Sequence, residues 1–103
     1  MKIAAIAVLA TVCIFSGPAN SLTTFGAYDC GEWFQRPQAR GWLLGVLTGV
    51  NLMTADDKIR YDPLNKLGSA EQAYLWMDNY CRANPLKTVL NGASDLYLEL
   101  QKK

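Results

Sequence analysis

The sequence contains no histidine. This absence excludes Ser-His-Asp and Cys-His nucleophilic machinery and removes the commonest metal-binding side chain. Cysteine is scarce as well, with three residues in 103. Outside the N-terminal apolar run there are only Cys30 and Cys81, too few for a four-cysteine zinc site and too far apart for a C-x-x-C redox pair. The chain therefore lacks the residues of the commonest catalytic and metal sites.

Carboxylates are the remaining candidates for such a site. The one local acidic cluster, Asp56, Asp57 and Asp62, lacks the glycine and the terminal glutamate of an EF-hand, so we expect a solvated loop there. Glu32 lies close to Cys30, but no second group is placed to act with it, and its position suits a carboxylate at the start of a helix. We therefore expect a protein that is not an enzyme and has no cofactor and no metal.

The first 21 residues have the features of a secretory signal peptide. Lys2 precedes an apolar run over residues 3–15, and small residues precede a cut after Ser21, with cleavage after Ala19 as the alternative. Cys13 is not preceded by the small residue of a lipobox, so we expect it to be discarded with the signal peptide rather than lipidated. The sequence thus predicts an exported protein with one domain, residues 22–103.

Charge in this domain is balanced. The chain has ten Lys and Arg and nine Asp and Glu, and loss of Lys2 leaves nine of each. No basic surplus exists to attract nucleic acid or an anionic membrane surface. We expect a protein partner instead.

The two cysteines of the domain are most simply a disulfide, because an exported protein folds in an oxidising compartment. Two free thiols are the alternative. Closing a loop of about 50 residues stabilises the folded state by up to roughly 4 kcal/mol. For a domain of 82 residues that is a large share of the total stability.

The most apolar stretch of the domain, residues 41–53, predicts a helix with almost no polar side. Leu44 and Leu52 extend its apolar surface beyond the main stripe, as in helices that are buried all round. Thirteen residues span about 20 Å, too short for a membrane core of about 30 Å, so we expect a buried core helix. Close approach of another helix is expected along three glycines at spacing four, Gly41, Gly45 and Gly49.

Shorter signals predict the other elements. Residues 22–28 are an extended lead-in, and Asp29 caps a short helix that ends at Pro37 and places Cys30, Trp33 and Phe34 on one side. Residues 54–68 form a surface loop with four apolar residues attached to the core, Ile59, Tyr61, Leu64 and Leu67.

Two amphipathic helices follow. A capping box of Ser69 and Gln72 starts a helix whose apolar stripe contains Ala70, Ala73, Tyr74, Trp76, Met77, Tyr80 and Cys81. Asn84 and Pro85 end this helix and start the last one, whose stripe contains Leu86, Val89, Leu90, Ala93, Leu96, Tyr97 and Leu100. The sequence thus predicts a small all-α domain, an orthogonal bundle of about four helices with one disulfide between the first and the third.

Three tryptophans are many for a domain of this size. At helical spacing such residues are more often core, but they can also form an aromatic binding face. Two leucines lie off their helix stripes and are either ordinary exposed side chains or part of a contact surface. The candidate contact residues are therefore Trp33, Trp42, Leu75, Trp76 and Leu98.

Three stretches of the chain, residues 29–34 (DCGEWF), 42–51 and 80–85 (YCRANP), resemble the HdeA/HdeB family of small periplasmic acid-stress chaperones. The resemblance implies a periplasmic four-helix domain that is often a homodimer at neutral pH, with Cys30 and Cys81 as the disulfide. It also implies that acid loosens the dimer and exposes apolar surface that holds unfolded periplasmic proteins. A similar arrangement of helices appears in small exported immunity proteins of type VI secretion, which bind and neutralise one specific toxin.

The composition is compatible with an acid response. Without histidine, little titrates between pH 5 and 8, whereas the nine carboxylates take up protons around pH 4 and below. The net charge of the domain then rises from about zero to about +9, and self-repulsion loosens a dimer or a packed surface.

Overall fold

The computed structural model of the protein describes residues 23–55 and 61–103. Four parts of the sequence-based predictions lie outside these residues: the signal peptide (1–21) with Cys13, Leu22 of the lead-in, the acidic residues Asp56 and Asp57, and Ile59.

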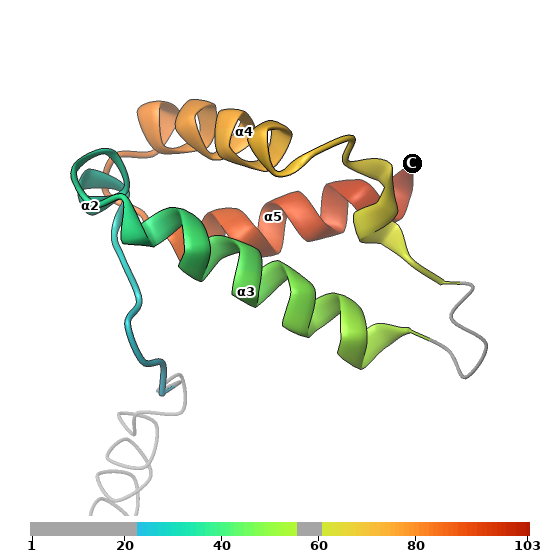
Figure 1. Ribbon diagram of the computed structural model, residues 1–103. Coiled ribbons are helices and arrows are strands. Elements are labelled where there is room, and N and C mark those ends of the chain that lie inside the picture. Colours follow the sequence, from blue (N-terminus) through green and yellow to red (C-terminus); the bar gives the residue numbers. More distant parts are fainter. Residues whose placement is uncertain (1–22, 56–60) are drawn as a thin grey trace, which may run out of the picture.

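Four α-helices and one 3-10 helix make up the described structure. They are α2 (Cys30–Gln35), α3 (Gln38–Thr54), η1 (Pro63–Lys66), α4 (Ala70–Ala83) and α5 (Val89–Lys102). In Figure 1, α5 runs between α4 and α3, and α2 lies across the end where α3 begins and α4 ends. The predicted all-α bundle of four helices is confirmed.

The core is apolar and draws side chains from all four α-helices. Its most buried helix is α5, because six of its fourteen residues are buried. The buried apolar side chains are Cys30, Trp33, Ala39, Leu43, Leu47, Ala73, Met77, Cys81, Val89, Ala93, Leu96, Tyr97 and Leu100.

The disulfide Cys30–Cys81 links α2 to α4, as predicted. The two Cα atoms are 5.0 Å apart, within the usual range for a disulfide, and both cysteines are buried. Next to it, the chain before α2 pairs with the loop before α5. The Cys30 amide donates to the Lys87 carbonyl at 3.0 Å, and the Val89 amide donates to the Tyr28 carbonyl at 3.0 Å. The disulfide is therefore one part of a joint that fixes both ends of the α4–α5 connection.

The first helix begins as the sequence predicts. The Asp29 carboxylate accepts from the Glu32 amide at 2.7 Å, and the Glu32 carboxylate accepts from the Asp29 amide at 3.1 Å. This reciprocal pair is a complete capping box. Glu32 is thus used as a helix-start carboxylate.

Two predicted helix starts are wrong in detail. Ser69 does precede α4, but its side chain makes no cap hydrogen bond, and the Gln72 side chain accepts from the Gly68 amide instead. The last helix starts at Val89 rather than at Pro85, because Thr88 and Asn91 form a reciprocal capping box there. Residues 85–87 form a turn, and Leu86, predicted to lie on the buried stripe, is 98% exposed.

The predicted loop 54–68 contains the short helix η1. Leu64 and Leu67 pack against the core as predicted, whereas Tyr61 is 41% exposed and is not among the residues packed against it. The Lys66 ammonium donates to the Leu100 carbonyl at 2.8 Å and also to the Lys103 carbonyl, so η1 is tied to the C-terminal end of α5.

Candidate functional site

The C-terminal half of α3 is exposed rather than buried. Only Ala39, Leu43 and Leu47 of this helix are buried, and all three lie in its first ten residues. Beyond them, Leu52 is 71% exposed and Met53 is 85% exposed. The prediction of a helix buried all round is therefore wrong, because α5 and η1 hold one side of its C-terminal half and no described element covers Leu52 and Met53.

The expected helix contact along the glycines is also wrong. A Cβ atom built on Gly41, Gly45 or Gly49 meets no atom within 4 Å among the described residues. The three glycines instead form an open strip on α3, and Leu52 and Met53 continue it toward the C-terminal end of the helix.

An apolar groove lies between α3 and α5. Its volume is about 270 Å³. The residues that line it are Val46, Leu47, Val50, Leu90, Ala93, Ser94, Tyr97 and Leu98. We refer to it as the α3–α5 groove. Val46, Val50 and Met53 recur at helical spacing, so the exposed end of α3 continues one wall of this groove.

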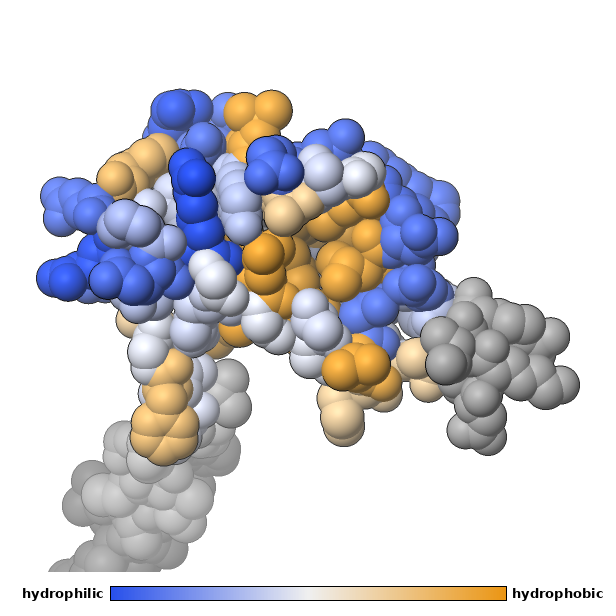
Figure 2. All heavy atoms as spheres, viewed as in Figure 1, coloured by the Kyte–Doolittle hydropathy of each residue, from blue (hydrophilic) through white to orange (hydrophobic). Residues whose placement is uncertain are grey.

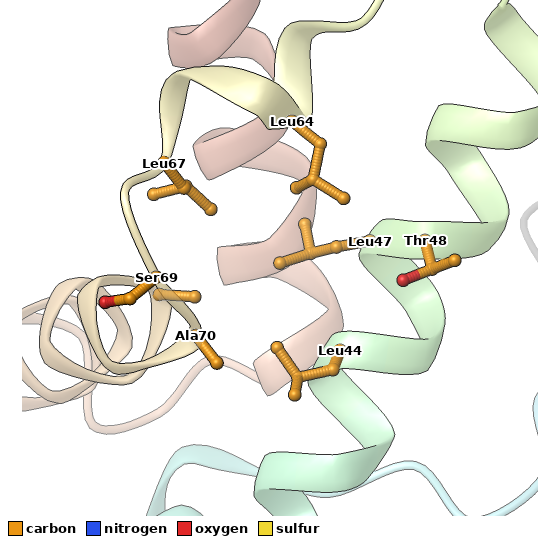
Figure 3. A pocket seen from close by; sticks show the side chains of 8 residues that line it. Leu44, Leu47, Thr48, Leu64, Leu67, Ser69 and Ala70 are labelled. Carbon is orange, nitrogen blue, oxygen red and sulfur yellow. The ribbon is translucent and has the colours of Figure 1, made fainter.

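A second apolar hollow, the α3–α4 pocket, lies next to this groove. Its volume is about 210 Å³, and it is lined by Leu44, Leu47, Thr48, Leu64, Leu67, Ser69, Ala70 and Ala73. Figure 3 shows the leucines of α3 and of the η1 segment pointing into the same space, with the start of α4 closing it. Leu47 lines both hollows, so the two apolar recesses adjoin at this side chain.

These features form a substantial apolar surface. In Figure 2, apolar side chains gather in the middle of the view, between α3 and α4, and again at the lower edge over the C-terminal end of α3. Exposed apolar clusters of this kind are candidate interaction sites. We call the α3–α5 groove, the α3–α4 pocket and the exposed end of α3 (Val50, Leu52 and Met53) together the apolar face.

Hydrogen bonds, rather than apolar burial, hold the exposed half of α3 to the fold. The Asn51 amide donates to the Asp62 carboxylate at 2.7 Å, and its oxygen accepts from the Leu64 amide at 3.2 Å and from the Tyr97 hydroxyl at 3.1 Å. The Thr54 and Tyr97 hydroxyls lie 2.6 Å apart. This Asn51 cluster ties the distal part of α3 to η1 and α5.

The structure brings only one of the five predicted contact residues into the hollows of this face. Leu98 lines the α3–α5 groove. Leu75 is exposed on α4 but lines neither hollow. Trp76 stacks on Tyr80 with ring centroids 5.3 Å apart, and Trp42 donates its indole N–H to the Phe25 carbonyl at 3.0 Å.

The fifth residue, Trp33, is only 5% exposed. Its indole N–H donates to the Asp78 carboxylate at 2.7 Å. Phe34, expected on the same side, is instead half exposed under the Arg82 guanidinium, 5.6 Å from the ring centre. The ring of Trp33 thus belongs to the core, and only its indole N–H reaches a partly exposed partner, Asp78.

The sequence did not identify Val50, Leu52 and Met53 as exposed. All three lie in the helix predicted to be apolar all round, and that helix was interpreted as buried. The polar stretch that follows them could have indicated otherwise, since no apolar segment comes next in the chain to cover that end.

The described residues offer little for acid–base or metal chemistry. No three His, Cys, Asp or Glu side chains of residues 23–55 and 61–103 lie close enough together to hold a metal ion. Burial of the Tyr80 hydroxyl raises the pKa of this residue, and the negative charge of Asp95 raises it further. In the same part of the chain, no helix has the length and apolar character needed to cross a membrane.

Comparison of the chain with protein-family models, with curated proteins and with solved structures finds no match. The resemblance to the HdeA/HdeB family therefore stays a prediction that rests on the three stretches quoted above.

Proposed function

We propose that the protein is an exported, HdeA/HdeB-like acid-stress chaperone that holds unfolded periplasmic proteins on its apolar face. The observation that carries the proposal is the exposed end of α3 together with the two apolar recesses that line this helix. Export and the periplasmic location rest on the predicted signal peptide and on the resemblance.

The shape of the apolar face suits unfolded chains. Recesses of about 210 and 270 Å³ each have room for an aliphatic or aromatic side chain. Burial of apolar area gives roughly 25 cal/mol per Å² regardless of sequence, so such recesses accept many different segments. A holding chaperone needs this lack of selectivity.

Acid acts on a joint that borders this face. The Asp62 carboxylate accepts a hydrogen bond from the Asn51 amide, which joins the exposed half of α3 to the segment just before η1. Protonation removes the charge that strengthens such bonds. The Cys30–Cys81 disulfide persists in acid and keeps α2 on α4 while α3 loosens.

The test is suppression of client aggregation by the oxidised protein. Light scattering of an acid-denatured model enzyme is followed at about pH 2.5, where carboxylates are protonated, and on return to neutral pH. Met53→Lys is compared with Leu86→Lys, which adds the same charge at an equally exposed position away from the apolar face. We expect suppression by the wild type and by Leu86→Lys and a clear loss for Met53→Lys. Absence of suppression by the wild type contradicts the proposal.

A second candidate function is favoured by one observation. The apolar face is already exposed in the folded domain, as in a protein that binds one folded partner. The second candidate is therefore an exported immunity protein of type VI secretion, which binds and neutralises one specific toxin. It predicts tight one-to-one binding to that toxin at neutral pH, measured by calorimetry, with no activity toward unrelated unfolded proteins.

A further inference from the structure

A separate polar cleft lies where α2, α3 and α4 meet. Its volume is about 370 Å³, within the range of small-molecule sites, and its walls are formed by Trp33, Phe34, Gln35, Pro37, Arg40 and Asp78. None of these residues lines the α3–α5 groove or the α3–α4 pocket. The cleft is therefore independent of the apolar face.

The anionic wall of the cleft is held in place. Asp78 accepts at one carboxylate oxygen from the indole N–H of Trp33 at 2.7 Å. The Trp33 ring is buried and packs against Tyr74, with ring centroids 6.4 Å apart, so the donor is rigid. Among the described residues, no group donates to the second oxygen of Asp78 and no cation lies within 4 Å of it.

The cationic wall is also held in place. The Arg40 guanidinium lies over the Tyr74 ring, 4.9 Å from its centre. This cation–π contact positions the guanidinium, whose N–H groups are the donors with which Arg binds carboxylates. Within the described part of the chain, no carboxylate lies within 4 Å of Arg40. Tyr74 and Asp78 are one helical turn apart on α4, so the cation and the anion border the same cleft.

The two charges decide the class of ligand. A simple anion is attracted by Arg40 but repelled by Asp78. A simple cation is attracted by Asp78 but repelled by Arg40. A ligand with one positive and one negative group satisfies both. Apolar contact is available beside them from Phe34, which is half exposed, and from Pro37.

We propose that the polar cleft binds a free amino acid as its zwitterion, with the carboxylate on Arg40, the ammonium on Asp78 and the side chain along Phe34. The protein then has a small-molecule site in addition to its apolar face.

The probe is L-phenylalanine, titrated into the oxidised protein at pH 7 and followed by NMR. The indole N–H of Trp33 is the reporter, because it is bonded to Asp78. We expect saturable shifts of this resonance. N-acetyl-L-phenylalanine lacks the ammonium, L-phenylalaninamide lacks the carboxylate, and each is expected to bind at least about tenfold more weakly, since a missing charge leaves its partner unpaired.

Two variants keep the fold and remove one charge each. Asp78→Asn retains an acceptor for Trp33, and Arg40→Met retains apolar contact with Tyr74; each is expected to weaken binding at least about tenfold. Arg36→Met is the control, because Arg36 pairs with Glu32 at 3.6 Å and does not line the cleft. Circular dichroism verifies that every variant is folded.

Three results overturn the proposal. One is the absence of saturable shifts with phenylalanine, leucine and glutamate up to about 10 mM, a very weak affinity even for a small ligand. Another is equal binding of phenylalanine and its two blocked analogues, which indicates partition of an aromatic ring only. The third is unchanged binding by both charge variants.

Discussion

At the scale of single residues, Gly92 sets how closely α4 and α5 approach. A Cβ atom at this position lies 2.5 Å from the Met77 sulfur and 2.8 Å from a ring carbon of Tyr80. The two helices pack at this point because the side chain is absent. Gly45 of α3 is the opposite case, a helical glycine with open space around it.

We predict that Gly92→Ala lowers the free energy of unfolding by about 1–3 kcal/mol through overpacking. Gly45→Ala, with the same added methyl group, is expected to raise it by up to about 1 kcal/mol, because alanine favours the helix more than glycine does. Urea denaturation of the two variants measures both effects. Equal effects of the two substitutions would show that α4 and α5 do not approach as described.

Tyr80 is a second residue whose side chain lowers the stability of the folded state in a way that can be tested. Its hydroxyl is buried, and the described residues offer it no hydrogen-bond partner. Burial, with a further contribution from Asp95, raises the pKa of Tyr80, so the neutral phenol is favoured in the folded state. The contribution of this group to stability is therefore complete below about pH 10 and falls as the pH rises beyond it.

We predict that Tyr80→Phe raises the free energy of unfolding at pH 8 by up to about 1 kcal/mol, because an unsatisfied buried hydroxyl is removed. The variant should also lose less stability than the wild type between pH 9 and about pH 11. Urea denaturation at pH 8, pH 9 and about pH 11 is the measurement. A variant that is less stable than the wild type at pH 8 would indicate that the hydroxyl has a partner.

At the scale of elements, α3 has two different halves. Its first half is anchored in the core by Leu43 and Leu47, whereas its second half is attached through the Asn51 cluster. A segment with few buried apolar contacts has low local stability. The exposed end of α3 is thus the part of the apolar face that separates most readily from the fold.

We predict that Asn51→Ala increases amide hydrogen exchange selectively in residues 48–54 and at Leu64. The substitution removes the hydrogen bonds to Asp62, Leu64 and Tyr97, with a loss of global stability of about 1–3 kcal/mol. Asn65→Ala, in the exposed part of η1, serves as the control and should change neither quantity. Uniform protection along α3 in Asn51→Ala would contradict the division of this helix into two halves.

How far the elements were predictable depends on whether the signal was local. The Asp29 cap and most of the apolar stripes of α4 and α5 are local patterns and were predicted correctly, whereas the reciprocal bond to Glu32 was not predicted and Leu86 lies outside the buried stripe. The start of α5 was missed because Asn84-Pro85 is an equally good start signal, and the pairing of residues 28–30 with 87–89 selects Thr88 instead.

The site was harder to predict than the fold. Periodicity shows which side of α3 is apolar, but whether a neighbouring element covers it depends on tertiary arrangement. Val50 and Met53 were therefore assigned to the interior, while Leu98 was identified because it lies off its helix stripe. Neither the Trp33–Asp78 bond nor the stacking of Arg40 on Tyr74 has a signal in the sequence, since each joins residues far apart in the chain.

At the scale of the whole molecule, the disulfide fixes one end of the bundle and leaves the other end less constrained. Cys30 and Cys81 are 51 residues apart, and the bond lies near α2 and the α4–α5 connection. Helix α3 begins beside α2, and its exposed C-terminal end lies at the other end of the bundle from the disulfide. The molecule thus combines a covalently closed end with an apolar end held by hydrogen bonds.

We predict that Cys30→Ser/Cys81→Ser lowers the free energy of unfolding by up to about 4 kcal/mol at neutral pH. In acid the loss should be enough to unfold the domain, because self-repulsion of the protonated chain adds to it. Circular dichroism between pH 7 and pH 2 measures this. A variant that keeps its helical signal throughout would show that the disulfide is not needed for the acid state.

Site-specific crosslinking tests the central claim, capture of unfolded proteins on the apolar face, most directly. A photo-crosslinking side chain is placed at position 53, at the exposed end of α3, or at position 86, in the α4–α5 turn, and the oxidised protein is irradiated with an acid-denatured client at about pH 2.5. We expect crosslinks to the client from position 53 and far fewer from position 86. Equal crosslinking from both positions, or none from position 53, would contradict it.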